Sequence, residues 1–252
     1  MYLNHFGLLR SPFGLTPLTS AYCKVETNDI IGSIKQSIDM GDGIIKITGD
    51  CGVGKTLLCY KLMRLFPKEY HTLYIFNPSM TADEVNKLIA DDLGVTGKTN
   101  YEILQKIRKH LMIHFEQGKK YILLVDEAQS FSLEVLESFR LLSNFETETD
   151  KLIQMILVGE LPLEEKLAHP KLHQLRQRVS LSHQIMPLSL QATSVYLSHR
   201  LVYAGHENGR LFTPSACEYL HQETKGFPRA LNILAHRAMI LAHQKGLDVV
   251  DA

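Results

Sequence analysis

The segment GDCGVGKT occupies residues 49–56 and joins two different hydrophobic patterns. Before it, residues 44–48 form a short apolar run typical of a β-strand, and after it residues 55–66 have the apolar spacing of a helix. The segment fits the pattern GxxxxGK[ST], which carries meaning when a strand precedes it and a helix follows. Its glycines let backbone N–H groups wrap an anion, and the helix start adds a partial positive charge. This context favours a phosphate-binding loop over a glycine-rich turn with a chance lysine.

Individual residues of this loop have predicted roles. Lys55 would reach the β- and γ-phosphates of a nucleotide, and the hydroxyl of Thr56 would be a ligand of Mg²⁺. The residues expected to bind ATP or ADP are Gly49, Asp50, Cys51, Gly52, Val53, Gly54, Lys55, Thr56 and Leu57.

An acidic pair, Asp126 and Glu127, directly follows the apolar run YILLV at 121–125. A strand with such continuous apolar character is buried on both faces, and ligands of α/β proteins bind at the carboxyl ends of such strands. Asp126 would hold the Mg²⁺ shell, and Glu127 would orient and polarise the attacking water. An acidic pair alone is often a surface turn, but the phosphate loop upstream favours a catalytic role.

Strands and helices alternate as far as Pro187. Further strands are predicted at 71–76, 121–125, 152–158 and 179–185, and helices at 28–40, 81–93, 101–117, 133–145 and, in short pieces, 161–177. This alternation predicts an α/β fold with a parallel five-stranded sheet flanked by helices. After Pro187 only helices are predicted: one capped by Ser189, one starting at Thr213-Pro214 and one over 229–244. Residues 188–252 therefore form a small all-helical domain.

The two ends of the chain are less regular. Residues 1–26 are rich in proline, glycine and aromatic residues, so we expect an irregular segment packed on the α/β core of residues 27–187. Residues 247–252 stop without a clear helix end, and we expect the helical domain to be truncated there.

The composition excludes several classes of protein. Lys and Arg number 27, as do Asp and Glu, and the zero net charge argues against a protein that coats DNA. The four cysteines form no CxxC pair and are expected to be reduced thiols of the cytosol. The N-terminal sequence MYLNHFGLLRSPFG lacks the pattern of a signal peptide, and no apolar run reaches the ~18 residues of a transmembrane helix.

Together, the loop, the acidic pair and the helical domain resemble the AAA+ ATPases. Further segments resemble the ExeA-like ATPases, the family of general secretion pathway protein A, and within it the MSHA pilus biogenesis ATPases of the MshM type. These segments are FGL at 6–8 with PF at 12–13, LVDEAQ at 124–129, RLLSNFET at 140–147, ILVG at 156–159, LRQR at 175–178 and GFPR at 226–229. The resemblance covers essentially the whole chain and implies an ATPase domain over 27–187 with a lid over 188–252.

The resemblance also implies roles for three side chains outside the loop. Arg229 resembles the sensor 2 arginine, which contacts the γ-phosphate of its own subunit, and the alternative is a solvent-facing arginine at a helix start. Arg178 resembles the arginine finger that acts on a neighbouring subunit's nucleotide; Arg176 is the second candidate, and a plain surface cation is the alternative. Asn77 resembles a polar residue that restrains the catalytic glutamate, although a turn-forming Asn before proline is an equally good interpretation.

One position departs from the family pattern. Glu160 follows ILVG where relatives usually place Gln, and a carboxylate near the γ-phosphate would be repelled, so either Glu160 turns away or hydrolysis is slow. The pairs His110/His114 and His169/His173 have the i, i+4 spacing of metal ligands on a helix. No cysteine or acidic set completes either pair, so surface or partner-facing histidines are the better interpretation.

The resemblance implies an enzyme that hydrolyses ATP to ADP and phosphate with Mg²⁺ and assembles into a ring or dimer. It implies work in the cytoplasm beside an inner-membrane partner, in building a secretion or type IV pilus-like apparatus. Two alternatives stay open. A transposition- or replication-helper ATPase would bind DNA in a salt-sensitive manner, which the neutral charge disfavours. A nucleotide-dependent scaffold with little turnover would be compatible with Glu160.

Overall fold

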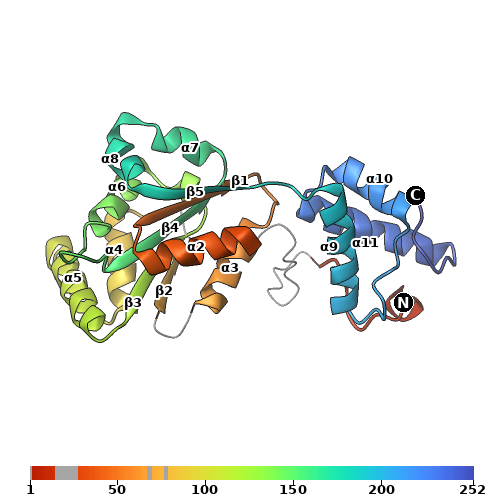
Figure 1. Cartoon of the computed structure of the whole chain (residues 1–252), viewed down its shortest axis with the longest axis horizontal. Coiled ribbons are helices and arrows are strands. Elements are labelled where there is room, and N and C mark those ends of the chain that lie inside the picture. Colours follow the sequence, from red (N-terminus) through yellow and green to blue (C-terminus); the bar gives the residue numbers. More distant parts are fainter. Residues whose placement is uncertain (1, 15–27, 67–69, 77–78) are drawn as a thin grey trace. The chain divides into compact units, whose positions relative to one another are not determined.

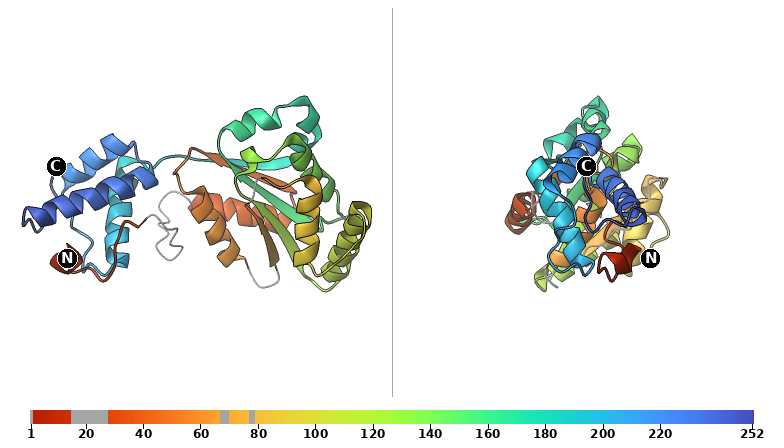
Figure 2. Two further views of the ribbon diagram at one scale, coloured as in Figure 1. Left: turned by 180° about the vertical axis from the view of Figure 1, so that it is seen from behind. Right: turned by 90° about the vertical axis from the view of Figure 1, so that its right-hand side faces the viewer.

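The structure, a computed structural model, describes residues 2–14, 28–66, 70–76 and 79–252. The chain divides into two compact units, whose elements are drawn in Figures 1 and 2. The sheet unit comprises Ile30–Gly49 and Leu62–Gln184. The helical unit comprises Met1–Asp29, Asp50–Lys61 and Ile185–Ala252.

A five-stranded parallel sheet forms the centre of the sheet unit, with the order β2-β3-β4-β1-β5. Its strands are β1 (Ile44–Gly49), β2 (Tyr70–Ile75), β3 (Lys120–Val125), β4 (Ile153–Gly159) and β5 (Val179–Ile185). The register pairs Thr48 with Gly159 and Val125 with Leu157. The carboxyl ends of β1, β3 and β4 therefore lie side by side at one edge of the sheet, so the residues after β3 and β4 are neighbours.

Helices cover both faces of this sheet, as the apolar strands predict. The helices and 3₁₀ turns of the sheet unit are α2 (Asn28–Met40), α4 (Ala82–Asp92), α5 (Asn100–Glu116), η2 (Ala128–Ser130), α6 (Leu133–Leu142), α7 (Pro162–Leu167), η3 (Pro170–Leu172) and α8 (His173–Gln177). Leu123 and Val125 of β3 pack in one apolar cluster with α4, α5 and α6. The alternate residues Ile122 and Leu124 point to the opposite face and are equally buried, and Figure 1 shows α2 lying over that face.

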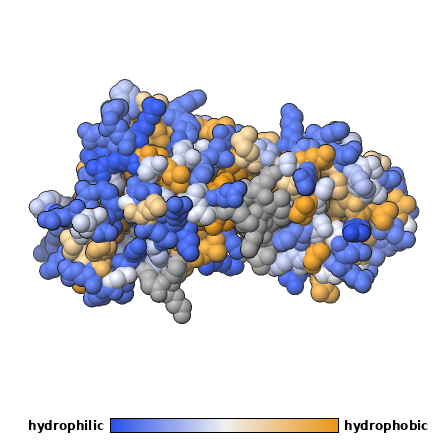
Figure 3. Space-filling view, viewed as in Figure 1, coloured by the Kyte–Doolittle hydropathy of each residue, from blue (hydrophilic) through white to orange (hydrophobic). Residues whose placement is uncertain are grey.

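The helical unit is built mainly from α9 (Leu190–Tyr203), α10 (Pro214–Thr224) and α11 (Pro228–Gln244). The predicted caps are present: Ser189 accepts a hydrogen bond from the N–H of Ala192, and Thr213 accepts one from the N–H of Ala216. The helix α3 (Lys55–Leu65) starts in this unit. On the face drawn in Figure 3, polar residues predominate, and apolar residues gather in small groups on each of the two units.

The described part of the N-terminal segment, 2–14, packs on the helical unit, which corrects the expectation that it packs on the α/β core. It begins with a short helix, α1 (Tyr2–His5). Phe6, Leu8 and Phe13 are buried in one apolar cluster with residues of α9 and α11. The buried Arg200 of α9 donates hydrogen bonds to the backbone oxygens of Pro12 at 2.6 Å and Gly14 at 3.2 Å. Apolar burial and this arginine together tie the segment to the helices.

The predicted elements agree with the structure within one or two residues, with one larger difference. The helix predicted over 133–145 ends at Leu142, because the chain turns at Ser143. The N–H of Phe145 then bonds to the oxygen of Leu142, and the N–H of Leu152 bonds to the oxygen of Phe145. Phe145 still packs against the core from this turn. Its apolar side chain continued the helical pattern and so extended the prediction too far.

Candidate nucleotide-binding and catalytic site

The predicted phosphate loop belongs to the helical unit from Asp50 onward. Gly52 and Gly54 have φ angles of +85° and +103°, a region that favours glycine, and this lets the chain curl before α3 begins. Lys55 is 5% exposed, and its Nζ donates a hydrogen bond to the backbone oxygen of Asp50 at 2.9 Å. The ammonium group is thus folded back over the loop. A cation and a helix N-terminus on one short stretch of backbone suit a phosphate group.

Arg229, the predicted lid arginine, lies against this loop within the helical unit. Its N–H donates to the backbone oxygen of Gly52 at 3.3 Å, and a Cβ added at Gly52 would lie 3.1 Å from the Cβ of Arg229. The turn before it explains this placement. Gly226 has a φ of +74°, and a Cβ there would lie 2.0 Å from the oxygen of Leu188, so only glycine fits. Pro228 then opens α11 as its first residue.

Asp126, the first acidic residue, is buried at the carboxyl end of β3. Its Oδ1 accepts a hydrogen bond from the N–H of Glu127 at 2.9 Å, and its Oδ2 accepts one from the hydroxyl of Tyr74 at 3.1 Å. These donors orient the carboxylate and offset part of the cost of burying it. The carboxylate of Asp126 and the hydroxyl of Thr56, each taken by itself, carry the hard oxygen atoms that Mg²⁺ prefers, so the chemistry of both predicted ligands suits this metal.

Glu127, the second acidic residue, has an unusual backbone. Its φ of +54° and ψ of +36° lie in the left-handed region, which is uncommon for a residue with a side chain. Its Oε2 accepts a hydrogen bond from Nε2 of Gln129 at 2.6 Å. The Oε1 of the same Gln129 amide accepts the N–H of Glu160 at 2.9 Å. The structure therefore brings Glu127 and Glu160 together through one side chain.

Tyr74 and Gln129 are the polar partners that the sequence analysis missed as site residues. Gln129 is the last residue of the segment LVDEAQ and follows Glu127 by two residues, and this short spacing is the feature of the sequence that could have indicated a contact between them. Tyr74 pairs in register with Leu124 on the neighbouring strand, a relation that needs the sheet order.

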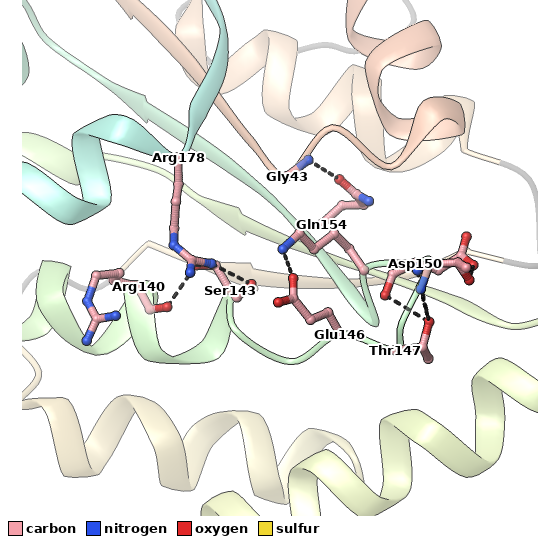
Figure 4. Close-up of polar contacts among 10 residues, drawn as sticks. Gly43, Arg140, Ser143, Glu146, Thr147, Asp150, Gln154 and Arg178 are labelled. Carbon is pink, nitrogen blue, oxygen red and sulfur yellow. Dashed lines mark hydrogen bonds and ion pairs between the residues drawn. The ribbon is translucent and has the colours of Figure 1, made fainter.

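Arg178 lies at the other edge of the sheet, just before β5. Its backbone oxygen accepts the N–H of Ile44, the first residue of β1. Its Nη1 donates to the backbone oxygen of Ser143 at 3.2 Å and to the Ser143 hydroxyl at 3.3 Å (Figure 4). A cavity of about 300 Å³ beside it is also lined by Lys151, whose pKa is lowered by burial and then by the charge of Arg178. Arg178 is therefore separated by the length of a strand from the acidic pair of its own chain.

Other predicted candidates lie elsewhere. Arg176 is exposed on α8, and Asn77 lies outside the described residues. His110 and His114 contact each other and both bond to the hydroxyl of Tyr121; burial is the main cause of their lowered pKa values, followed by nearby positive groups. Across the described ranges no group of three or more His, Cys, Asp or Glu side chains has the arrangement of a metal site.

A family model described as an AAA domain matches residues 38–167, more than half of the chain. The chain belongs to the AAA domain family. It is also similar to general secretion pathway protein A of Aeromonas hydrophila, with 35% identity over 250 residues. That alignment covers 98% of this chain and 46% of the relative, so this AAA protein spans less than half of the relative's length. In the part of the chain that the structure describes, no helix is long and apolar enough to cross a bilayer.

Solved structures confirm the fold of this AAA protein. Cdc6p from Pyrobaculum aerophilum superposes with a TM-score of 0.71 at 17% identity, covering 95% of this chain and 67% of that one. The ORC2 protein of Aeropyrum pernix, solved with ADPNP and ADP, superposes with a TM-score of 0.68 at 16% identity, covering 96% of this chain and 68% of that one. The RuvB branch migration motor of Thermotoga maritima superposes with a TM-score of 0.60 at 14% identity, covering 95% of this chain and 69% of that one. At these identities the likeness concerns the fold alone.

Proposed function

We propose that this AAA protein binds ATP with Mg²⁺ and hydrolyses it to ADP and phosphate. The observation that carries the proposal is the acidic pair after β3, where a buried Asp126 is followed by a Glu127 held in a left-handed turn. Backbone strain of this kind persists where the surrounding structure enforces it, and it occurs often at active sites. The phosphate loop, with Lys55 folded over it, supplies the second half of the required chemistry.

Each residue has a distinct task in the proposed reaction. The loop residues Gly49–Leu57 bind the phosphates through backbone N–H groups, and Lys55 neutralises charge on the β- and γ-phosphates. Thr56 and Asp126 would hold Mg²⁺, which when bound offsets negative charge on the phosphates. Glu127 orients the attacking water and accepts its proton. Arg229 contacts the γ-phosphate from the same chain.

The biological task is proposed from the relative. Similarity to general secretion pathway protein A supports a role in assembling a secretion or type IV pilus-like apparatus, with a protein of the inner membrane as partner. Arg178 is the proposed arginine finger, which implies self-association into a ring or dimer so that it reaches a neighbour's nucleotide. Work in the cytoplasm, next to that membrane partner, follows from the same proposal.

Two other functions compete with this proposal. A DNA-associated helper ATPase would share the AAA fold, but the formal net charge of zero gives no basic excess for nucleic acid. A scaffold that binds nucleotide with little turnover would share the whole site, and Glu160 beside Gln129 keeps that alternative open.

The experiment compares two variants that separate binding from turnover. Lys55→Ala should lose nucleotide affinity because a phosphate contact of the ground state is gone. Glu127→Gln should keep ATP and lose about 10²–10⁴-fold in hydrolysis, because the amide keeps the shape without the base. Binding is measured with a fluorescent ATP analogue and hydrolysis by phosphate release. Wild-type turnover in Glu127→Gln contradicts the assignment, and a wild-type protein that binds ATP without releasing phosphate supports the scaffold.

A further inference from the structure

The side chain of Gln129 joins the two acidic positions of the site through both ends of one amide group. Its Nε2 donates to Oε2 of Glu127 at 2.6 Å, and its Oε1 accepts the N–H of Glu160 at 2.9 Å. A backbone N–H can only donate, so the amide oxygen must face Glu160. The amide NH₂ must then face Glu127, and the orientation of the amide follows from the network itself.

The surroundings of Gln129 hold it in this place. It lies in the 3₁₀ turn η2, and Nζ of Lys166 donates to the backbone oxygens of both Gln129 and Phe131. At the end of β4, a Cβ added to Gly159 would lie 2.8 Å from Oε1 of Gln129. A side chain at position 159 would therefore displace the amide. The turn after β3 and the end of β4 are therefore fastened to each other at this side chain.

We propose that Gln129 is a positioning residue, which fixes the carboxylate of Glu127 for its attack on water by tying it to the backbone at the end of β4. This inference rests on the proposed function of Glu127. A glutamate side chain that is partly exposed samples several rotamers, and each one moves its oxygens by more than the tolerance of a reacting geometry. Holding Oε2 selects one rotamer. The other carboxylate oxygen, Oε1 of Glu127, makes no hydrogen bond within the described residues, and it is the oxygen left to face a water molecule.

The link also gives the position after ILVG a role that needs no glutamine side chain. At Glu160 it is the backbone N–H that contacts Gln129, and a backbone N–H is present whatever the side chain. The end of β4 therefore acts on Glu127 through Gln129, even though Glu160 departs from the family pattern.

Two substitutions separate the two ends of the amide. Gln129→Met keeps the length of the side chain and removes both hydrogen bonds. Gln129→Glu keeps an oxygen that accepts the N–H of Glu160, but it replaces the donor to Glu127 by a second carboxylate. Gln105→Met, at an exposed position of α5, is the matched control. All variants are compared with the wild-type chain by circular dichroism and thermal unfolding before kinetics.

Both Gln129 variants should lower kcat for ATP by roughly 10- to 100-fold, the cost typical of a misplaced catalytic group. Affinity for a fluorescent ATP analogue, and KM, should stay within about twofold of wild type, and Gln105→Met should behave as wild type. In a Glu127→Asp background, where the shorter side chain no longer reaches the amide, Gln129→Met should change kcat by less than about twofold. A structural role would reduce the rate equally in both backgrounds.

Several results would overturn the proposal. The first is a wild-type kcat in Gln129→Glu together with a loss in Gln129→Met. The second is a loss of kcat on Gln129→Met that is as large in the Glu127→Asp background as in the wild-type background. The third is a faster kcat in Gln129→Met, which would mean that the amide restrains Glu127. Glu127→Gln is measured alongside. If it hydrolyses ATP at the wild-type rate, the proposed function fails and the positioning role fails with it. If it is inactive while both Gln129 variants turn over normally, only the positioning role fails.

Discussion

Two arginines of this AAA protein, Arg178 and Arg229, are held in opposite ways. At the amino end of β5 the guanidinium of Arg178 is already bonded to Ser143 of its own chain. At the start of α11 Arg229 is exposed, and its backbone N–H, not its side chain, is held by the loop oxygen of Gly52. Arg178 thus helps to hold the end of α6, while the side chain of Arg229 lies beside Gly52 of the predicted phosphate loop. Variants of Arg178 must therefore be judged on stability and turnover together.

The largest expected effect is on Arg178. Arg178→Ala should bind ATP normally and lose roughly 10³–10⁵-fold in hydrolysis, because an arginine finger stabilises charge on a neighbour's γ-phosphate. Mixing it with Glu127→Gln should partly restore activity, since some interfaces then combine an intact Glu127 with an intact Arg178. Phosphate release is measured against total protein concentration, and it should rise more steeply than linearly.

A matched set makes this result specific. Arg178→Lys keeps the charge but loses the planar fork and should stay impaired, while Arg176→Ala should be near wild type. If subunits exchange and the mixture stays inactive, Arg178 acts in its own subunit or only as the cap of α6. Loss of activity in Arg176→Ala alone would move the assignment to that residue.

A smaller effect is expected at Arg229. Arg229→Ala should weaken ATP binding by about tenfold and ADP binding by much less, because the lost contact is to the γ-phosphate. The thermal midpoint without nucleotide should not change, since the exposed side chain is not needed for the helix. Isothermal titration with a non-hydrolysable ATP analogue and with ADP measures the difference. Equal weakening for both nucleotides would contradict the γ-phosphate contact.

Cys51 offers a test of whether nucleotide binds at the loop that Arg229 contacts. Cys51 is exposed in the loop, whereas Cys59 of α3 is fully buried, so Cys51 should alkylate several-fold faster, and ATP should protect it by covering the loop. A short iodoacetamide pulse followed by peptide mapping, with and without ATP, measures both rates. Labelling of Cys51 that is indifferent to ATP would place the nucleotide elsewhere.

The smallest effect concerns Ser143. Ser143→Ala removes the hydroxyl that accepts from Arg178 and donates to the oxygen of Arg140. Stability should fall by about 1 kcal/mol, with turnover per folded molecule unchanged, because the backbone oxygen of Ser143 still holds Arg178. Denaturant unfolding measures the stability, and phosphate release measures the turnover. Ser182→Ala, at an exposed position, is the control. If Ser143→Ala loses as much turnover as Arg178→Ala, the hydroxyl of Ser143 is needed for the proposed action of Arg178 on the neighbouring subunit's nucleotide.

The parts of the molecule that the sequence could predict are those encoded within one element. The strand and helix on either side of the predicted phosphate loop, the apolar strands and the helix caps Ser189 and Thr213 each depend on neighbouring residues, and the structure has these elements and caps at the predicted positions. What the sequence could not supply are partners from other elements. Tyr74 reaches Asp126 only because β2 pairs with β3, and Ser143 meets Arg178 only once α6 lies beside the start of β5. No periodicity encodes such pairs.

The hydrogen bonds from Arg200 to Pro12 and Gly14 have a consequence for the order in which the protein folds. Phe6, Leu8 and Phe13 are synthesised long before the helices that bury them, α9 to α11. A ribosome adds about 5–20 residues per second, so these three side chains wait on the order of ten seconds for their partners. The sheet unit, whose residues come in between, can fold during that wait. The helical unit takes residues from both before and after the sheet unit in the chain, so it is completed after the sheet unit.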